Sequence, residues 1–244
     1  MKHRFFVDYT EFESNDIVLT GENAAHAAVL RLAIGEEIVI YDNNGMDYHC
    51  IVTSTGKSET RAKFLHKSVN MAEPQIAITL FQALPKTGKM EEIVDKCTQL
   101  GIMRIVPVVT ARCVSKISDK DAKKVDRWQK IAQSAASQSG RARIPKVNSV
   151  MTFDAALENT KCYGTAFVCY ENEESLSLKV FLSSMIQKPL SISYFIGSEG
   201  GFTDEEITKF NKINIPTVSL GPRILRTELA GAAVLTNILY ELDS

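Results

Sequence analysis

The chain has 244 residues, of which 45% are hydrophobic and 23% charged, a composition typical of globular proteins. This length allows one large domain, or a medium-sized domain with a smaller partner. No window of about eighteen uncharged apolar residues occurs, and Asp8 and Glu11 interrupt the first stretch before a signal-length apolar core could form, so we expect a cytoplasmic protein with no membrane span.

Residues 1–70 favour β structure. Short segments with partial alternation of apolar and polar residues are separated by turn signals, and one helix interrupts them at about 22–32. Small β-barrels have this rhythm. The expected strands lie at residues 36–45, 46–55 and 60–69.

A domain boundary is expected close to Pro74, which disfavours helix at the residue before it. Immediately after this proline, the short β segments give way to apolar strands that alternate with amphipathic helices. We therefore expect a small β-domain over residues 1–72 and a larger domain over residues 73–244.

In the second region, apolar strands alternate with amphipathic helices. This order predicts an α/β domain with a parallel sheet covered on both faces. The expected strands lie at residues 76–84, 103–110, 162–171, 191–197 and 217–221. The expected helices lie at residues 89–101, 119–139, 177–187, 203–213 and 228–242.

One stretch is strongly basic, although the whole chain has a net charge of −1. Residues 112–146 hold ten basic and three acidic side chains, a net charge of +7, which leaves −8 for the remainder. A basic stretch in an acidic protein can steer a polyanion such as RNA. A solvated helix face explains the same residues equally well, because Lys and Arg are common there.

The cysteines and histidines do not form a recognisable metal site. The five cysteines include no CxxC pair, and the four histidines are not spaced as ligands. We therefore expect reduced thiols and no bound metal.

The first of two glycine-bearing loops, IGSEGGF at residues 196–202, follows an expected strand. Ligands of open α/β sheets bind at the carboxyl ends of strands, and paired glycines let backbone approach a ligand closely. Neither GxxxxGK[ST] nor GxGxxG occurs in the chain, and Glu199 would repel an anion. An uncharged or cationic ligand with hydroxyl groups, such as S-adenosylmethionine, suits the loop better. Taken alone, a tight turn before a helix capped by Thr203 and Glu206 is the simpler explanation.

The second loop, SLGPRILRTE at residues 219–228, crowds two arginines, a proline and a glycine at the end of the last expected strand. A surface salt bridge with Glu228 or Glu199 is the simple explanation for Arg226. The two loops belong to adjacent strand–helix units, which favours one shared site over two separate ones.

Together, IGSEGGFTDEE and SLGPRILRTELAGAA resemble the signature of the SPOUT class of methyltransferases, and within it the ribosomal RNA small-subunit methyltransferase E family. The resemblance extends over nearly the whole chain, through HRFFV, HAAVLR, KMEEIVDKCTQLGI, IVPVVTARC and QKIAQSAASQSGRARIPKV. It implies an N-terminal PUA-like β-barrel that helps to bind RNA, a C-terminal α/β domain with a trefoil knot, and a homodimer. It also implies methylation of N3 of one uridine in the 16S ribosomal RNA of the small subunit, with S-adenosylmethionine as cofactor.

The resemblance assigns residues to roles. Arg226 would be catalytic, because a guanidinium beside a carbonyl oxygen stabilises the charge that forms when uracil N3 loses its proton; binding of a phosphate is the alternative role. Glu199 would accept that proton, cap the helix or orient the cofactor. The cofactor would contact Ile196, Gly197, Gly200, Leu220, Gly221, Ile224, Leu225 and Thr227. RNA would contact Arg4, His26, Arg31, Arg112, Arg141, Arg143 and Lys146.

Three positions depart from the family pattern. The family usually has proline where Ser198 stands, glutamate where Gln99 stands and threonine where Leu229 stands. Ser198 loosens the first loop, since proline would fix φ there. These departures put individual roles in doubt more than the assignment.

The sequence alone also allows other functions. Another SPOUT enzyme would act on a transfer-RNA guanine or on a ribose 2′-hydroxyl, and a non-catalytic RNA-binding assembly factor could share the fold. A dinucleotide-dependent oxidoreductase is disfavoured because GxGxxG is absent.

Overall fold

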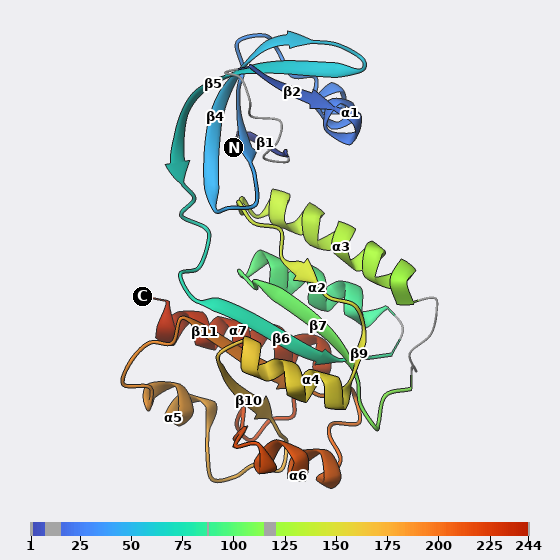
Figure 1. Ribbon diagram of the computed structural model, residues 1–244, viewed down its shortest axis with the longest axis vertical. Coiled ribbons are helices and arrows are strands. Elements are labelled where there is room, and N and C mark those ends of the chain that lie inside the picture. Colours follow the sequence, from blue (N-terminus) through green and yellow to red (C-terminus); the bar gives the residue numbers. More distant parts are fainter. Residues whose placement is uncertain (1, 8–15, 87, 115–120, 244) are drawn as a thin grey trace. The chain divides into compact units, whose positions relative to one another are not determined.

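The computed structural model describes residues 2–7, 16–86, 88–114 and 121–243 (Figure 1). The chain divides into two compact units. The N-terminal unit comprises Met1–Glu73 and Ala136–Ile144, and the C-terminal unit comprises Pro74–Ala135 and Pro145–Ser244. Neither unit is a single continuous stretch of sequence.

The N-terminal unit is a five-stranded sheet with the order β1-β3-β4-β5-β2. β1 pairs parallel with β3, and the other pairings are antiparallel. One helix, α1 (Gly21–Leu30), joins β2 to β3 and packs on its core, which includes Phe5, Ile17 and Ile38. The strands are β1 (His3–Phe6), β2 (Asp16–Thr20), β3 (Glu37–Tyr41), β4 (Met46–Thr55) and β5 (Glu59–Val69).

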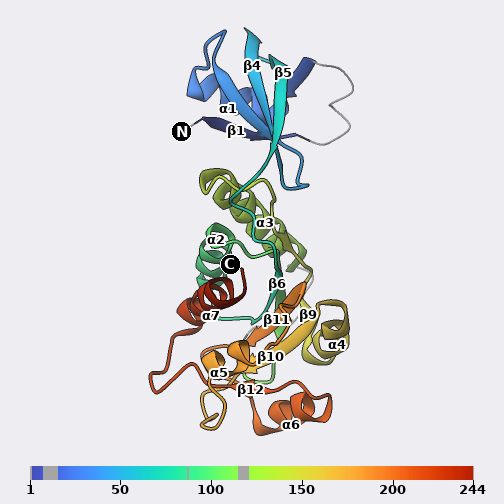
Figure 2. The same cartoon turned by 90° about the vertical axis from the view of Figure 1, so that its left-hand side faces the viewer.

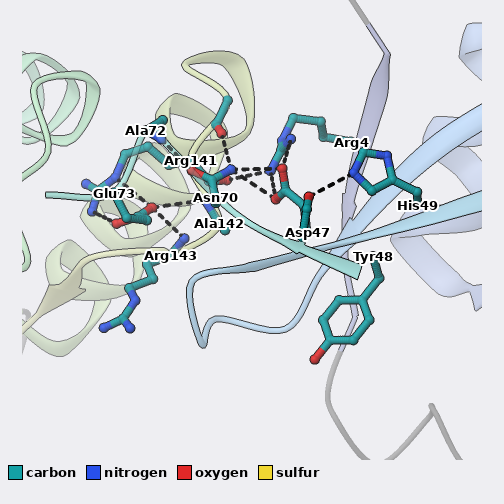
Figure 3. A network of polar contacts seen from close by, with 12 residues as sticks. Arg4, Asp47, Tyr48, His49, Asn70, Ala72, Glu73, Arg141, Ala142 and Arg143 are labelled. Atoms are coloured by element: carbon teal, nitrogen blue, oxygen red, sulfur yellow. Dashed lines mark hydrogen bonds and ion pairs between the residues drawn. The ribbon is translucent and has the colours of Figure 1, made fainter. Parts of the chain in front are cut away.

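A buried ion pair holds residues 141–143 in this unit (Figure 3). The side chain of Arg141 is 2% exposed and donates to Glu73 through Nε at 3.2 Å and Nη2 at 2.9 Å. The backbone N–H groups of Ala142 and Arg143 donate to the same carboxylate, each at 2.9 Å. Glu73 therefore satisfies a buried guanidinium and two backbone groups at once.

A second carboxylate, that of Asp47, extends this network (Figure 3). Arg4 donates to both of its oxygens, at 3.1 and 2.6 Å. The Asn70 amide also donates to both oxygens, and it donates to the carbonyl of Gly140 at 3.0 Å. The segment around residue 140 is thus bound to the N-terminal unit by side-chain contacts rather than by sheet pairing.

The C-terminal unit is built on a parallel sheet with the order β12-β10-β11-β6-β7-β8, and β9 also pairs with β7. The prediction of a parallel sheet is confirmed. Its strands are β6 (Ala77–Ala83), β7 (Arg104–Val109), β8 (Lys146–Val147), β9 (Met151–Thr152), β10 (Thr165–Cys169), β11 (Ser191–Ile196) and β12 (Thr217–Val218). Its helices are α2 (Lys89–Gln99), α3 (Asp121–Gln138, whose last three residues group with the other unit), α4 (Phe153–Asn159), the 3-10 helix η2 (Thr160–Cys162), α5 (Leu178–Ser183), α6 (Asp204–Lys212) and α7 (Thr227–Leu242).

Helices lie on both sides of the sheet, with α2 and α7 on one side and α4 on the other (Figure 2). Alternate residues of a strand point to opposite faces of a sheet. Phe81 of β6 and Phe195 of β11 stack with centroids 4.3 Å apart, in a cluster that includes residues of α4 and α6. Tyr194 faces the other layer, where its hydroxyl donates to the carbonyl of Gly231 in α7 at 2.8 Å. In that layer α7 packs beside α2.

Most long elements lie where the sequence predicts them, within a few residues at each end. Two residues of the predicted helix 119–139, Asp119 and Lys120, lie outside the described residues. β1 and β2 lie in the region that we expected to be mostly β, although we had not located them. Four short elements, β8, β9, α4 and η2, occur where we expected no regular structure. Among the described residues, no helix combines the length and hydropathy needed to cross a bilayer.

Candidate active site

The two glycine-bearing loops converge on one cavity of about 970 Å³ in the C-terminal unit. The first loop leaves the carboxyl end of β11, and the second leaves the carboxyl end of β12, at the edge of a parallel sheet where ligands usually bind. All ten residues predicted to bind the cofactor or act in catalysis line this cavity. They are Ile196, Gly197, Glu199, Gly200, Leu220, Gly221, Ile224, Leu225, Arg226 and Thr227.

The first loop folds back tightly on itself. The N–H of Gly201 donates to the carbonyl of Ser198 at 3.0 Å, and Gly201 has a φ of 67°. A Cβ added at Gly197 would lie 2.9 Å from the Cα of Gly201, so only glycine fits this crossing. Ser198 is buried against the cavity, and its hydroxyl has no hydrogen-bond partner among the residues that the structure describes. The loop therefore offers a polar group for a ligand to satisfy.

The helix after this loop, α6, has the predicted capping box. Thr203 Oγ1 accepts from the N–H of Glu206 at 3.2 Å, and Glu206 accepts from the N–H of Thr203 at 2.9 Å. Glu206 also accepts from the N–H of Ala111 at 2.8 Å. The carboxylate of Glu206 is thus engaged in capping α6. The predicted capping of this helix by Thr203 and Glu206 is confirmed.

The start of α7 is hydrogen-bonded to both the first loop and the central strand β6. The Thr227 hydroxyl donates to the carbonyl of Gly197 at 2.6 Å and accepts from Nε2 of Gln82 at 2.9 Å. Gln82 is fully buried in β6. Gln82 was not predicted from the sequence, although a glutamine inside the apolar run IAITLFQAL is a signal for a buried polar contact.

Lys89 is the cationic partner of both acidic residues that we considered for Arg226. Its Nζ lies 3.1 Å from Oε1 of Glu199 and 3.1 Å from Oε2 of Glu228. Glu199 also accepts from the backbone N–H of Lys86, at 3.1 and 3.2 Å to its two oxygens. Burial disfavours the ionised form of Glu199, but hydrogen bonds from backbone N–H groups and from Lys89 outweigh it and lower the pKa of this carboxyl. Glu199 is therefore an ionised, already paired carboxylate.

A third segment, residues 169–177, supplies an acidic wall to the cavity. Glu173 accepts from the hydroxyl and N–H of Ser175, from the N–H of Leu176 and from the hydroxyl of Thr217. These hydrogen bonds, led by those from the Ser175 and Thr217 side chains, lower the pKa of Glu173 to about 2. Glu171 and Glu174 line the same wall. A cation or a polyhydroxyl ligand suits this surface better than an anion.

Five of the predicted RNA-binding residues lie at least partly at the surface. Lys146, His26 and Arg31 are exposed, and Arg143 is half-buried with its guanidinium donating to the carbonyl of Asn44 at 3.1 Å. Arg112 is exposed beside the cavity, where it donates to the carbonyl of Gly200 at 2.7 Å.

The other two predicted RNA-binding residues are paired inside the N-terminal unit. Arg141 is bound to Glu73, and Arg4 is bound to Asp47 with its side chain 11% exposed. Both guanidiniums stabilise the fold in this structure, so we no longer assign them to RNA.

The three departures from the family pattern have different positions. Ser198 lines the cavity, as described above. Gln99 is exposed on α2 and donates to Asp95 one turn earlier at 2.8 Å, and Leu229 is 49% exposed on α7. Neither belongs to the described residues that line the cavity. Within those residues, no group of three or more His, Cys, Asp or Glu side chains could hold a metal ion.

Comparison with known proteins covers nearly the whole chain. Residues 72–239 match the RNA methyltransferase domain family, and residues 19–65 match the RNA methyltransferase PUA domain family. The ribosomal RNA small subunit methyltransferase E of Bacillus subtilis (strain 168) is 32% identical, over 98% of this chain and 97% of the relative. A crystal structure of the Neisseria gonorrhoeae protein of the same name, bound to S-adenosyl methionine, is 28% identical with a TM-score of 0.88 and 98% coverage of both chains. A Legionella pneumophila protein solved with bound cofactor SAM is 27% identical, with a TM-score of 0.85 and the same coverage.

Proposed function

The chain belongs to the ribosomal RNA small subunit methyltransferase E family, and from that premise we propose that it transfers a methyl group from S-adenosylmethionine to N3 of one uridine in 16S ribosomal RNA. The expected fold class is confirmed, with a PUA-like domain in the N-terminal unit and an α/β domain of SPOUT type in the C-terminal unit. The observation that carries the proposal is the meeting of both glycine-bearing loops, with Arg226, at a single cavity.

The cavity fits the cofactor in size, charge and hydrogen-bonding capacity. Small-molecule sites usually enclose about 300–1,000 Å³, and this one has about 970 Å³. The unpartnered hydroxyl of Ser198 and the ionised Glu173 suit a ligand with hydroxyls and a positive charge. When bound, S-adenosylmethionine supplies an electrophilic methyl group on its sulfonium. The eight cofactor-binding residues predicted from the sequence would hold it.

Arg226 would act on the base. The N3 of uracil lies between two carbonyl groups, so its deprotonation spreads negative charge onto O2 and O4. The exposed guanidinium of Arg226, at the mouth of the cavity, would stabilise that charge through a carbonyl oxygen. The N3 proton would pass to solvent water, because Glu199 is already paired with Lys89 and would orient the first loop rather than accept it. Holding the base in line with the methyl group would supply further acceleration.

RNA would be held by basic side chains that lie at least partly at the surface. We assign phosphate contacts to Arg112, Arg143 and Lys146, and further RNA contacts to His26 and Arg31 on the PUA-like domain. Such contacts release counterions, so affinity for the small subunit should fall steeply with salt. An affinity that does not change with salt would contradict this assignment.

The family resemblance supports three further proposals: a homodimer, a trefoil knot in the C-terminal chain and a cytoplasmic location. Exposed apolar side chains on α7, Leu229 and Tyr240, support the homodimer, because a second copy could cover them. Light scattering in solution should give the mass of two copies. The mass of one copy would exclude the dimer.

Replacing Arg226 tests the catalytic assignment. Arg226→Ala should lower methyl transfer to isolated small subunits by more than about a hundredfold, because one oxyanion-stabilising donor is commonly worth that much. S-adenosylmethionine affinity, measured by calorimetry, should change little. The control is Arg61→Ala, an exposed arginine of β5 that does not line the cavity, which should keep most of the activity. Turnover of Arg226→Ala within about tenfold of the wild type would refute the role, and absence of cofactor binding in the wild type would favour a non-catalytic RNA-binding factor.

A further inference from the structure

Lys89 occupies a position where its charge is unfavourable unless it is paired. It is the first residue of α2, where the helix dipole places partial positive charge. Its side chain is only 31% exposed, and it reaches two carboxylates from two different segments. This pairing offsets the cost of a cation at a helix start. Hydrogen bonds from Lys89 to Glu199 and then to Glu228 raise the pKa of its ammonium, so it stays protonated across the neutral range.

The two carboxylates belong to the two loops that form the cavity. Glu199 is in the first loop, between Ser198 and Gly200, and Glu228 is in the first turn of α7, two residues after Arg226. Each carboxylate has one oxygen 3.1 Å from the same nitrogen, so the two negative charges face each other across the Lys89 ammonium. The charges of Arg226 and Lys96 also act on Glu228, but neither joins it to Glu199. Without the Lys89 cation, the two carboxylates would repel each other.

We propose that Lys89 is a positioning residue for methyl transfer, whose ammonium ties the first loop to the start of α7 and so fixes Arg226 relative to the cofactor-binding backbone. The inference rests on the proposed function, because it concerns the same cavity. A second, uncharged connection links the same two segments: the hydroxyl of Thr227, in α7, donates to the carbonyl of Gly197 and accepts from Gln82. α7 is therefore held to the first loop twice, once by a hydroxyl and once by an ion pair.

Removing the ammonium should change the site in a pH-dependent way. In Lys89→Met, repulsion between Glu199 and Glu228 would separate the loops at neutral pH, and it would raise the pKa of one carboxyl. Protonation of that carboxyl at lower pH would relieve the repulsion. The ratio of variant to wild-type S-adenosylmethionine affinity should therefore rise as pH falls from 8 to about 5.5, toward the ordinary range of carboxyl pKa values. A residue that acted only through packing would show no such dependence.

The test compares four proteins: wild type, Lys89→Met, Lys89→Arg and Lys96→Met. Lys96 is a matched control, since it forms an ion pair with Glu92 on the same helix but does not line the cavity. S-adenosylmethionine affinity is measured by calorimetry across the pH range, and kcat and KM are measured on small subunits. We expect kcat/KM of Lys89→Met to fall by about tenfold to a hundredfold, because small misplacements of catalytic groups cause losses of this size. Lys89→Arg should recover much of the loss, and Lys96→Met should match the wild type.

The outcomes separate the two proposals. A wild type that neither binds the cofactor nor methylates RNA overturns the proposed function. An active wild type with Lys89→Met unchanged within about twofold, with a pH-independent affinity ratio, or with no rescue by Lys89→Arg overturns the positioning role. Thermal unfolding of each variant shows whether it is folded. If Lys89→Met does not fold, Glu228→Gln takes its place, because it removes one of the two carboxylates that Lys89 joins. The pKa of Glu228 is lowered from 4.5, so the loss of affinity relative to wild type should shrink only as pH falls below 4.5, where the wild-type carboxyl takes up its own proton. A loss that stays constant below that pH overturns the role.

Discussion

At the scale of single residues, Gly197 controls how closely the two limbs of the first loop approach each other. Its missing Cβ would lie 2.9 Å from the Cα of Gly201 and 3.2 Å from the carbonyl carbon of the same residue. Both neighbours are backbone atoms, so neither can rotate away. The carbonyl of Gly197 also accepts from Thr227. A change at this residue therefore affects the loop and the start of α7 together.

Gly197→Ala should destabilise the protein by about 1–3 kcal/mol, the usual range for overpacking a tight site. It should weaken S-adenosylmethionine binding even where the protein stays folded, because the cofactor-facing backbone has to move. Gly56→Ala is the control for cofactor affinity, since Gly56 belongs to the N-terminal unit and is not among the residues that line the cavity. Chemical denaturation and calorimetry give the two quantities. Wild-type affinity in Gly197→Ala would show that the loop does not need this close approach.

The candidate site could be predicted from sequence where its residues stand in a continuous motif. Ile196, Gly200 and Thr227 lie in the two loops that the sequence singles out, and all three line the cavity. Gln82 and Lys89 were missed because they come from β6 and the start of α2, more than a hundred residues earlier in the chain. Only the folded sheet brings β6 and the start of α2 close to the two loops.

At the scale of elements, Glu173 joins the segment between β10 and α5 to the edge strand β12. It accepts from Ser175 and Leu176 in its own segment and from Thr217 of β12. Its pKa of about 2 in the folded protein lies below the ordinary 4.5 because these donors favour the ionised form. A carboxyl with a depressed folded-state pKa stabilises the fold above its unfolded pKa, and this contribution is lost as pH falls toward the folded value.

Glu173→Gln should therefore lower the Tm at pH 7, and the difference from wild type should shrink between about pH 4.5 and pH 2. Glu174→Gln is the control, because this neighbouring carboxyl is exposed. Thermal unfolding followed by circular dichroism across that pH range provides the measurement. A difference in Tm that stays constant down to pH 2 would mean that ionisation of Glu173 does not stabilise the segment.

The segment after α3 is held by hydrogen bonds to the carboxylate of Glu73. Arg141 is buried, and removal of its carboxylate partner would leave an uncompensated charge. Glu73→Ala should cost about 3–5 kcal/mol of unfolding free energy, the range for breaking a buried ion pair. Glu59→Ala, which removes a half-exposed partner of Arg61, should cost less than about 1 kcal/mol. Similar losses in both variants would remove the structural role that we give to Arg141 in place of RNA contact.

At the scale of the whole molecule, sequence order predicts the parallel sheet because alternating apolar strands and amphipathic helices leave few other arrangements. It does not predict that residues 136–144 group with the N-terminal unit. That grouping depends on Glu73, Asp47 and Asn70, which are scattered polar residues with no periodic pattern. β8 and β9 were missed for a related reason: they are two residues long, too short for any alternation to appear.

In the proposed reaction, N3 of one uridine in 16S ribosomal RNA receives the methyl group. The residues of the cavity support methyl transfer, and the assignment to uridine N3 rests on the family and on the chemistry proposed for Arg226. Another target, such as a transfer-RNA guanine or a ribose 2′-hydroxyl, would require the same cofactor and would give a different modified nucleoside.

The most direct test is mass mapping of methylated nucleosides in 16S ribosomal RNA from cells with and without this protein. We predict one 3-methyluridine that is absent without the protein and is restored by the wild-type chain, but not by Arg226→Ala. An unchanged set of methylated nucleosides in 16S ribosomal RNA, or the loss of any nucleoside other than 3-methyluridine, would contradict the proposed function.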